Sequence, residues 1–225
     1  MDTFTSFLMI IIGIVITLGA QLFVTSTYNK YKKVGNKKGL TGFEVARKIL
    51  DKNGLSDIHV VETKGMLSDH YDPNRKVVRL STDIFHGDSI AAISVAAHEV
   101  GHAIQHKKKY IFIRVRGLLF PIVNIGSKLG YFAILIGLFA GLTNLLWLGI
   151  ISLLLLLLFE LVTLPVEFDA SKRAKNELKK EKLIENDEVE KTSNMLNAAA
   201  FTYVAALVTT LLEIARLILI ARDRD

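Results

Sequence analysis

The chain has 225 residues, 51% of them hydrophobic, and a formal net charge of +6. Its long apolar runs indicate an integral membrane protein rather than a soluble one. The positive charge is mostly lysine beside those runs, without a basic stripe interleaved with aromatic residues, so nucleic-acid binding is not indicated. The absence of cysteine excludes structural disulfides and thiolate metal ligands.

The first apolar run predicts a transmembrane helix over residues 4–24. It has no basic segment before it, it is longer than the core of a signal peptide, and no small-residue cleavage site follows it. We therefore expect a retained membrane anchor.

Residues 25–120 predict a small α+β region on the cytoplasmic side. Residues 41–50 have helical periodicity with Thr41 as N-cap. Residues 58–61 and 76–81 are rich in β-branched side chains and predict short strands, with a turn signal at 72–74 between them. An Ala-rich stretch without proline predicts a further helix over about 88–105.

That last helix contains His98, Glu99 and His102, in the order His-Glu-Val-Gly-His. Residues four apart share a helix face, so both imidazoles can hold one metal ion. Glu99 is then placed to take a proton from a water molecule on the metal, which is the zinc-peptidase arrangement. His106 continues the series but lies about 12 Å from His98 on a straight helix, so we expect it to cap the basic helix end instead.

Two more apolar runs predict a transmembrane hairpin, residues 121–142 and 145–164, that turns at 141–144. A charged helical region follows over 165–195, and residues 196–220 predict a fourth span. Lysine and arginine cluster after the first span, before the second and after the third. By the positive-inside rule these segments face the cytoplasm and both termini lie outside.

A catalytic zinc needs a third protein ligand. Glu167 stands at the cytoplasmic end of the third span, where a carboxylate is costly unless it faces protein or a metal. Asp169 competes for this role from the opposite helix face. An interfacial carboxylate without a ligand role is the further alternative.

The motif 98–102, followed by Glu167-Phe-Asp-Ala-Ser171, resembles the membrane neutral zinc metallopeptidases of bacteria. These are relatives of the gluzincins, which include the CAAX prenyl protease and the heat-stress membrane protease. Residues 67–73 and 196–204 also resemble that bacterial family. The likeness extends over nearly the whole chain.

The resemblance implies that Glu167 is the third zinc ligand, beside His98 and His102. Those relatives carry an Asp where this chain has Ser171, so the residue that orients a zinc histidine is left open between Ser171 and Asp169. The expected fold is a mainly α membrane protein. Four transmembrane helices accompany a small cytoplasmic α+β zincin-like domain that carries the HExxH helix.

The expected activity is zinc-dependent hydrolysis of peptide bonds in membrane or membrane-proximal proteins, at a site that faces the cytoplasm. Protein or peptide substrates and the bilayer are the expected partners. An extended substrate is expected along the strand edge at Lys76–Leu80. His70 and Tyr71 are candidates for the donor that stabilises the oxyanion, although a polar turn is an equal interpretation.

Two other functions are considered. In the first, a site-2-type intramembrane protease, the chemistry lies within the bilayer, but residues 90–104 are short for a span and no Leu-Asp-Gly motif supplies an aspartate ligand. The second is a non-enzymatic channel, transporter or assembly factor using Lys128, Glu160, Glu213 and Arg216. For a hairpin turning near Asn144, Lys128 and Glu160 are predicted to lie level and to form a pair.

Overall fold

The computed structural model describes residues 3–65 and 68–224. The chain divides into two compact units. The helix unit comprises Met1–Leu22, Arg114–Pro165 and Phe201–Asp225, and the sheet unit comprises Phe23–Ile113 and Val166–Ala200. Leu67, which begins the stretch 67–73 noted above, lies outside the described residues.

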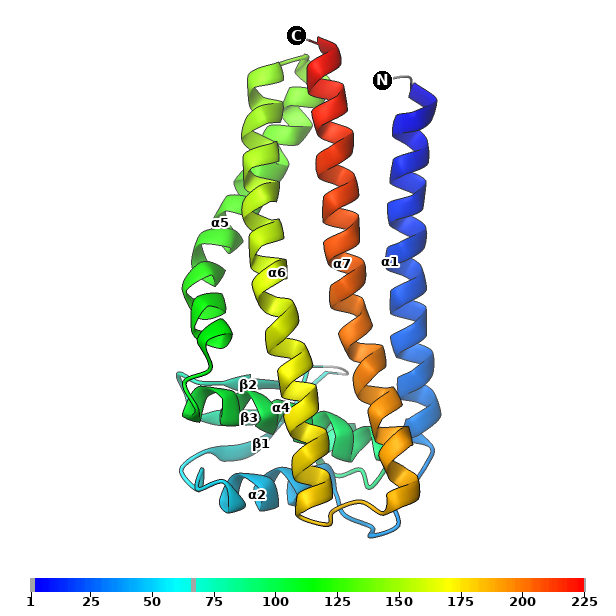
Figure 1. The fold of residues 1–225 in the computed structure, drawn as a ribbon, viewed down its shortest axis with the longest axis vertical. Coiled ribbons are helices and arrows are strands. Elements are labelled where there is room, and N and C mark those ends of the chain that lie inside the picture. Colours follow the sequence, from blue (N-terminus) through cyan, green and yellow to red (C-terminus); the bar gives the residue numbers. More distant parts are fainter. Residues whose placement is uncertain (1–2, 66–67, 225) are drawn as a thin grey trace. The chain divides into compact units, whose positions relative to one another are not determined.

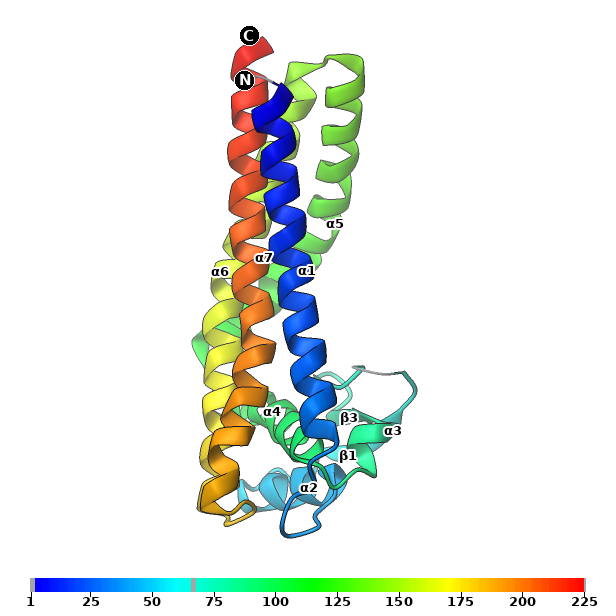
Figure 2. The ribbon, with the colours of Figure 1, turned by 90° about the vertical axis from the view of Figure 1, so that its right-hand side faces the viewer.

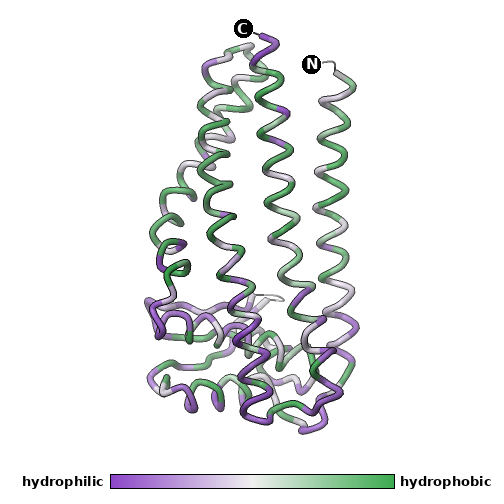
Figure 3. The backbone as a smooth tube through the Cα atoms, in the orientation of Figure 1, coloured by the Kyte–Doolittle hydropathy of each residue, from purple (hydrophilic) through white to green (hydrophobic). Residues whose placement is uncertain are grey.

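Four long helices run through the chain: α1 (Thr3–Lys32), α5 (Ile111–Ala140), α6 (Thr143–Lys180) and α7 (Val189–Arg224). A short 3-10 turn, η1 (Asn186–Glu188), precedes α7. Within the described residues, these are the four helices long and apolar enough to cross a membrane. Figure 3 shows hydrophobic residues predominating along much of each one. The four predicted spans are thus present as helices, while their exact membrane boundaries stay a prediction.

In the helix unit, α5 and α6 form a closely packed antiparallel hairpin. A Cβ at Gly130 would lie 2.2 Å from the Cβ of Ser152, and one at Gly149 would lie 2.2 Å from Cγ1 of Ile134. Small residues at such contacts let transmembrane helices approach. Gly141, with φ +71°, makes the turn between them. Figures 1 and 2 both show α1 alongside α7.

The predicted pairing of Lys128 with Glu160 is wrong. Gly130 faces Ser152, so on this register Lys128 is level with about residue 154, about 9 Å along the helix from Glu160. The turn comes earlier than Asn144, which shifts the register. Glu160 instead accepts a hydrogen bond from Thr210 Oγ1 on α7 at 2.9 Å.

In the sheet unit, three strands form one sheet in the order β1-β3-β2. The strand β1 (His59–Thr63) pairs parallel to β3 (Val77–Ser81), and β2 (His70–Asp72) pairs antiparallel to it. The turn signal at 72–74 is a real turn, in which Asp72 Oδ1 accepts from the Asn74 amide at 3.0 Å. The strand β2 was not predicted.

The expectation that Lys76–Leu80 offers a free strand edge is also wrong, because β3 is the central strand. Val77 to Arg79 pair with both neighbours. Beyond the end of β2, the carboxylate of Asp69 accepts from the Ser81 amide at 2.7 Å and so occupies that position of the ladder. An added strand has to use an outer edge, at β1 or β2.

Three helices complete the sheet unit: α2 (Gly42–Lys52), α3 (Thr82–Phe85) and α4 (Ile90–Lys107). Thr41 caps α2 as predicted, with its hydroxyl accepting from the Glu44 amide at 3.2 Å. Helix α4 packs against α2, α3 and the sheet. Its fully buried Ile90, Ile93 and Val100 belong to the core, which holds this helix in a fixed place.

Candidate metal centre

Three side chains with metal-binding atoms converge between α4 and the part of α6 that belongs to the sheet unit. They are His98 and His102 on α4 and Glu167 on α6, and their ligand atoms all lie within 4.8 Å of one another. Nε2 lies 3.3 Å from Glu167 Oε2 in His98 and 3.8 Å from it in His102. The structure therefore brings together all three residues that the sequence suggested as ligands.

Close approach of the two helices depends on Gly101, which lies inside the motif. A Cβ there would lie 2.6 Å from the carbonyl oxygen of Ala170. Ala170 and Ala174 on the facing side of α6 are small and buried. The lack of a side chain at Gly101 therefore lets α6 lie near α4, where Glu167 reaches the histidines.

His102 has its orientation fixed by Gln105, one turn further along α4. Gln105 is fully buried and its Oε1 lies 3.0 Å from His102 Nδ1. Its amide nitrogen donates to the Val166 carbonyl at 2.7 Å and to Asp169 Oδ2 at 2.9 Å. Because both of those groups only accept, the glutamine oxygen must face His102. His102 Nδ1 is then the donor, and Nε2 presents a lone pair to the other side.

Asp169 is thus not part of the ligand group. Its carboxylate accepts hydrogen bonds from the Gln105 amide and from the Arg173 guanidinium, whose Nε lies 2.5 Å from Oδ2. Ser171 holds the other histidine, because its Oγ lies 3.1 Å from His98 Nδ1. Both residues considered for orienting a histidine therefore contribute, Ser171 directly and Asp169 through Gln105.

Gln105 was missed by the sequence reasoning. Its one signal is a polar amide three residues after His102, on the same face of an otherwise apolar helix. That signal alone does not separate a buried partner from a surface residue.

Glu99 is buried beside the cluster, with 9% of its surface exposed. Burial raises the pKa of this carboxyl to about 7, and the negative charges of Glu167 and Asp69 add to the increase. The imidazoles of His98 and His70 oppose it. A carboxyl group with this pKa can both accept and release a proton near neutral pH.

The two candidates for oxyanion stabilisation lie in different surroundings on β2. His70 is exposed, acts electrostatically on Glu99 and has Nδ1 2.8 Å from the Ser68 carbonyl oxygen. The Tyr71 ring packs edge-on against His106, with 5.7 Å between ring centres. His106 is near the end of α4 and outside the ligand group. A role for either residue in oxyanion binding stays a prediction.

Comparison with known proteins identifies the family of the chain. Residues 6–222 match the model of a family described as "Putative neutral zinc metallopeptidase". The chain belongs to this family. It is also similar to a protein of Bacillus subtilis (strain 168) named "Putative membrane protease YugP", with 48% identity over 201 residues that cover 89% of each chain. No solved structure matches. Family membership supports a protease function and a place in the membrane.

Proposed function

We propose that this protein is a zinc-dependent membrane endopeptidase whose metal is held by His98, His102 and Glu167. The observation that supports this most is the convergence of two imidazoles and one carboxylate within 4.8 Å, beside the buried Glu99. Two histidines and a glutamate form a known catalytic zinc set that leaves a position open. The lone pair on His102 Nε2, fixed through Gln105, fits the same assignment.

Zinc in such a site supplies Lewis acidity toward a peptide carbonyl and toward water. The residues of the chain handle the proton. Glu99 takes it from the attacking water as the new carbon–oxygen bond forms, and then donates it to the amide nitrogen as the carbon–nitrogen bond breaks. The burial of Glu99 beside the three candidate ligands supports both roles.

The free edge of β2 is the position we propose for an extended substrate. This strand packs against α4, and its other edge is already paired with β3. A peptide that adds to an outer strand gains main-chain hydrogen bonds without needing a particular sequence. The edge of β2 takes the place of the expected edge at Lys76–Leu80, because β3 lies between the two other strands.

A site within the bilayer is less well supported. Helix α4 is not one of the four described helices that are long and apolar enough to span a membrane. It packs on a sheet instead. The non-enzymatic alternative has its own polar residues in the spans, but it does not account for the three convergent ligands and Glu99.

The test is zinc content and hydrolysis measured together on purified protein. Glu99→Gln should keep zinc and lose cleavage of casein or a fluorogenic peptide, because the base is removed and all ligands stay. His98→Ala and Glu167→Ala should lose both. His59→Ala, at an exposed histidine on β1, is the control and should keep both. Cleavage by Glu99→Gln would contradict the mechanism, and full zinc content in Glu167→Ala would contradict the ligand set.

We further propose that the site faces the cytoplasm, on the basis of lysine and arginine next to three of the spans. The chain lacks cysteine, so single cysteines at Gly35, Asn186 and Thr143 can be labelled one at a time. An impermeant thiol reagent on intact cells should label only the cysteine at 143. Labelling at 35 and 186 instead would reverse the orientation.

A further inference from the structure

The spans of the helix unit contain an ion pair between neighbouring turns of α7. Arg216 donates to Glu213 through Nε at 2.8 Å and through Nη2 at 2.5 Å, and its Nη1 lies 3.4 Å from Ser6 Oγ on α1. Only 8% of Arg216 is exposed. An ion pair within an otherwise apolar helix is costly in a membrane, which points to a role beyond packing.

A second carboxylate, Glu160, lies on α6. Its Oε1 accepts from Thr210, and its buried Oε2 has no hydrogen-bond partner among the residues that the structure describes. Within the same residues, the buried hydroxyl of Thr163, on the next turn of α6, also has none. Among the described residues, the guanidinium of Arg216 is thus bonded to Glu213, while Glu160 is held by a hydroxyl group.

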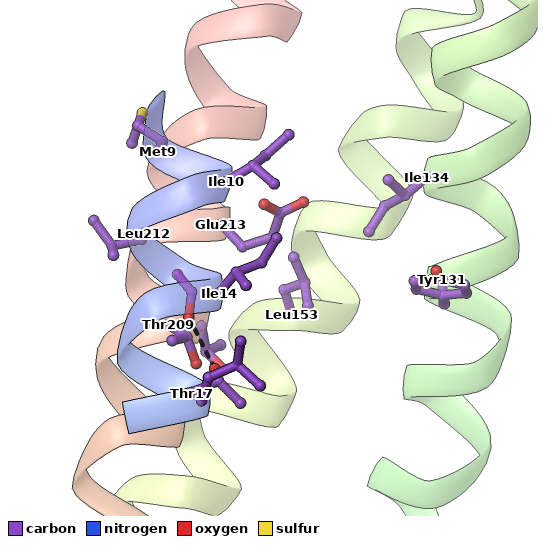
Figure 4. A pocket seen from close by; sticks show the side chains of 13 residues that line it. Met9, Ile10, Ile14, Thr17, Tyr131, Ile134, Leu153, Thr209, Leu212 and Glu213 are labelled. Carbon is purple, nitrogen blue, oxygen red and sulfur yellow. Dashed lines mark hydrogen bonds between the residues drawn. The ribbon is translucent and has the colours of Figure 1, made fainter. Parts of the chain in front are cut away.

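Two of the groups named above, Glu213 and Thr210, line a cavity of about 590 Å³ in the helix unit. Its walls come from α1, α5, α6 and α7, and they include Thr209, Thr210 and Glu213. Figure 4 shows the Glu213 carboxylate between Ile10 and Leu153, facing the space that Ile134 and Tyr131 border on the far side. Polar groups thus line one part of a largely apolar cavity.

The cavity is open toward the side where lipid would lie. Ile14 and Leu18 on α1 are 49% and 56% exposed, and Tyr131 on α5 is 63% exposed, although all three line it. A ligand can therefore enter sideways between α1 and α5. The volume falls within the range of about 300–1,000 Å³ that is typical of ligand sites. It suits the side chains of one helix face better than a whole helix, which is about 10–12 Å across.

A lipid acyl chain fits the apolar walls of the cavity but has no hydrogen-bond donor for Glu213 or the threonines. A transmembrane helix with one hydrogen-bond donor among aliphatic side chains fits both the apolar walls and these polar groups. Glu213 is already neutralised by Arg216 and still has lone pairs to offer, so it can accept another hydrogen bond without stranding a bare charge. Interhelical hydrogen bonds of this kind contribute to helix association in membranes.

We propose that this cavity binds the transmembrane helix of a protein substrate that carries a hydrogen-bond donor, such as Asn or Lys, at the same depth. That the bound helix belongs to a substrate depends on the peptidase function proposed above. The binding itself rests only on the cavity and its polar groups. The cavity would select membrane proteins by a polar residue within a span.

The test uses the full chain carrying Glu99→Gln, reconstituted in phosphatidylcholine vesicles with a model Leu-Ala transmembrane peptide. The peptide has Asn, Lys or Leu at its centre. A photo-crosslinking phenylalanine analogue replaces Tyr131 in the cavity or, as a matched control, Phe139 on the same helix, which is 90% exposed and outside the cavity. We expect crosslinking of the Asn and Lys peptides at position 131 to exceed that of the Leu peptide several-fold, with no such difference at 139.

A second variant removes the ion pair as a unit. Glu213→Leu with Arg216→Leu leaves no unpaired charge, and such replacements are often tolerated. The preference for Asn and Lys should disappear in this variant, while crosslinking of the Leu peptide shows that the helices are still assembled. Equal crosslinking of all three peptides in the parent, or crosslinking to lipid alone, would overturn the proposal.

The outcomes are separable from those of the peptidase test. Crosslinking is read without cleavage, and zinc content is measured on the same preparation. If the chain with Glu99 intact binds zinc and cleaves peptides, but the Glu99→Gln chain shows no preference at position 131, the cavity proposal alone is refuted. If the Glu99→Gln chain shows the preference but the chain with Glu99 intact has no hydrolytic activity, the peptidase function is refuted, and with it the description of the bound helix as a substrate.

Discussion

His102 Nδ1 lies 3.0 Å from Gln105 Oε1, and the network behind the glutamine admits only one direction for that hydrogen bond. The amide group is held by Val166 and Asp169, so it cannot turn over without placing its oxygen against two acceptors. A residue that touches no reacting atom thus decides which nitrogen of His102 is available.

Replacement of this glutamine should weaken metal binding without removing a ligand. In Gln105→Met, a side chain of similar length leaves His102 Nδ1 without its acceptor, and we expect zinc affinity to fall about 10- to 100-fold. Competition with a fluorescent zinc chelator measures it. His106→Gln, on the same helix and outside the ligand group, should change nothing. Unaltered affinity in Gln105→Met would mean that the glutamine only fills space.

Two substitutions of Ser171, the partner of His98, should have different effects on zinc affinity. Ser171 Oγ lies 3.1 Å from His98 Nδ1, so Ser171→Ala should weaken zinc binding. Ser171→Asp should match or exceed the parent, because a carboxylate is a stronger acceptor for an imidazole N–H. The same chelator competition follows both variants. A weaker site in Ser171→Asp than in Ser171→Ala would contradict the idea that residue 171 accepts the proton of His98 Nδ1.

Gly101→Ala should destabilise the protein even though alanine is the better helix former. Its Cβ would lie 2.6 Å from the Ala170 carbonyl, so α6 has to move away from α4. We expect a loss of about 1–3 kcal/mol, the usual result of overpacking, together with reduced zinc content. Gly117→Ala on α5, where no atom lies within 4 Å, is the control and should be neutral or stabilising. Thermal unfolding in detergent distinguishes the two.

The ionisation of Asp69 should make the stability of the protein depend on pH. Burial raises the pKa of this carboxyl above 3.8, against hydrogen bonds from Ser81 that lower it. The folded state therefore binds this proton more tightly than the unfolded state, and its ionisation costs stability as pH rises from about 4 through the raised pKa. Asp69→Asn keeps an acceptor for Ser81 and does not titrate. The melting temperature of the parent minus that of the variant should fall between pH 4 and pH 7, and a constant difference would show that the burial is without effect.

The spans and the histidine pair were predictable because each leaves a strong local pattern. An apolar run of about 20 residues, or two histidines four apart, needs no knowledge of the rest of the chain. Thr41 as N-cap is local in the same way, because its partner Glu44 is three residues away.

The features that the sequence did not predict depend on contacts between residues far apart in the chain. The strand β2 has only three residues, too few for an alternating pattern, and its place beside β3 depends on tertiary pairing. The offset between Lys128 and Glu160 follows from a turn placed three residues before Asn144, at Gly141. Gln105 acquires its role from Val166 and Asp169, more than 60 positions away.

The candidate ligands also set an order of events during synthesis. His98 and His102 are made before α5, whereas Glu167 follows 69 positions after His98, once α5 and the apolar first part of α6 have been translated. At about 5–20 residues per second, the ribosome needs several seconds to cover that interval. A chain arrested before the third span carries the base and two imidazoles without the carboxylate that completes the set. Biogenesis in the membrane would thus keep the nascent chain inert, and protect its neighbours in the bilayer, until the hairpin has been made.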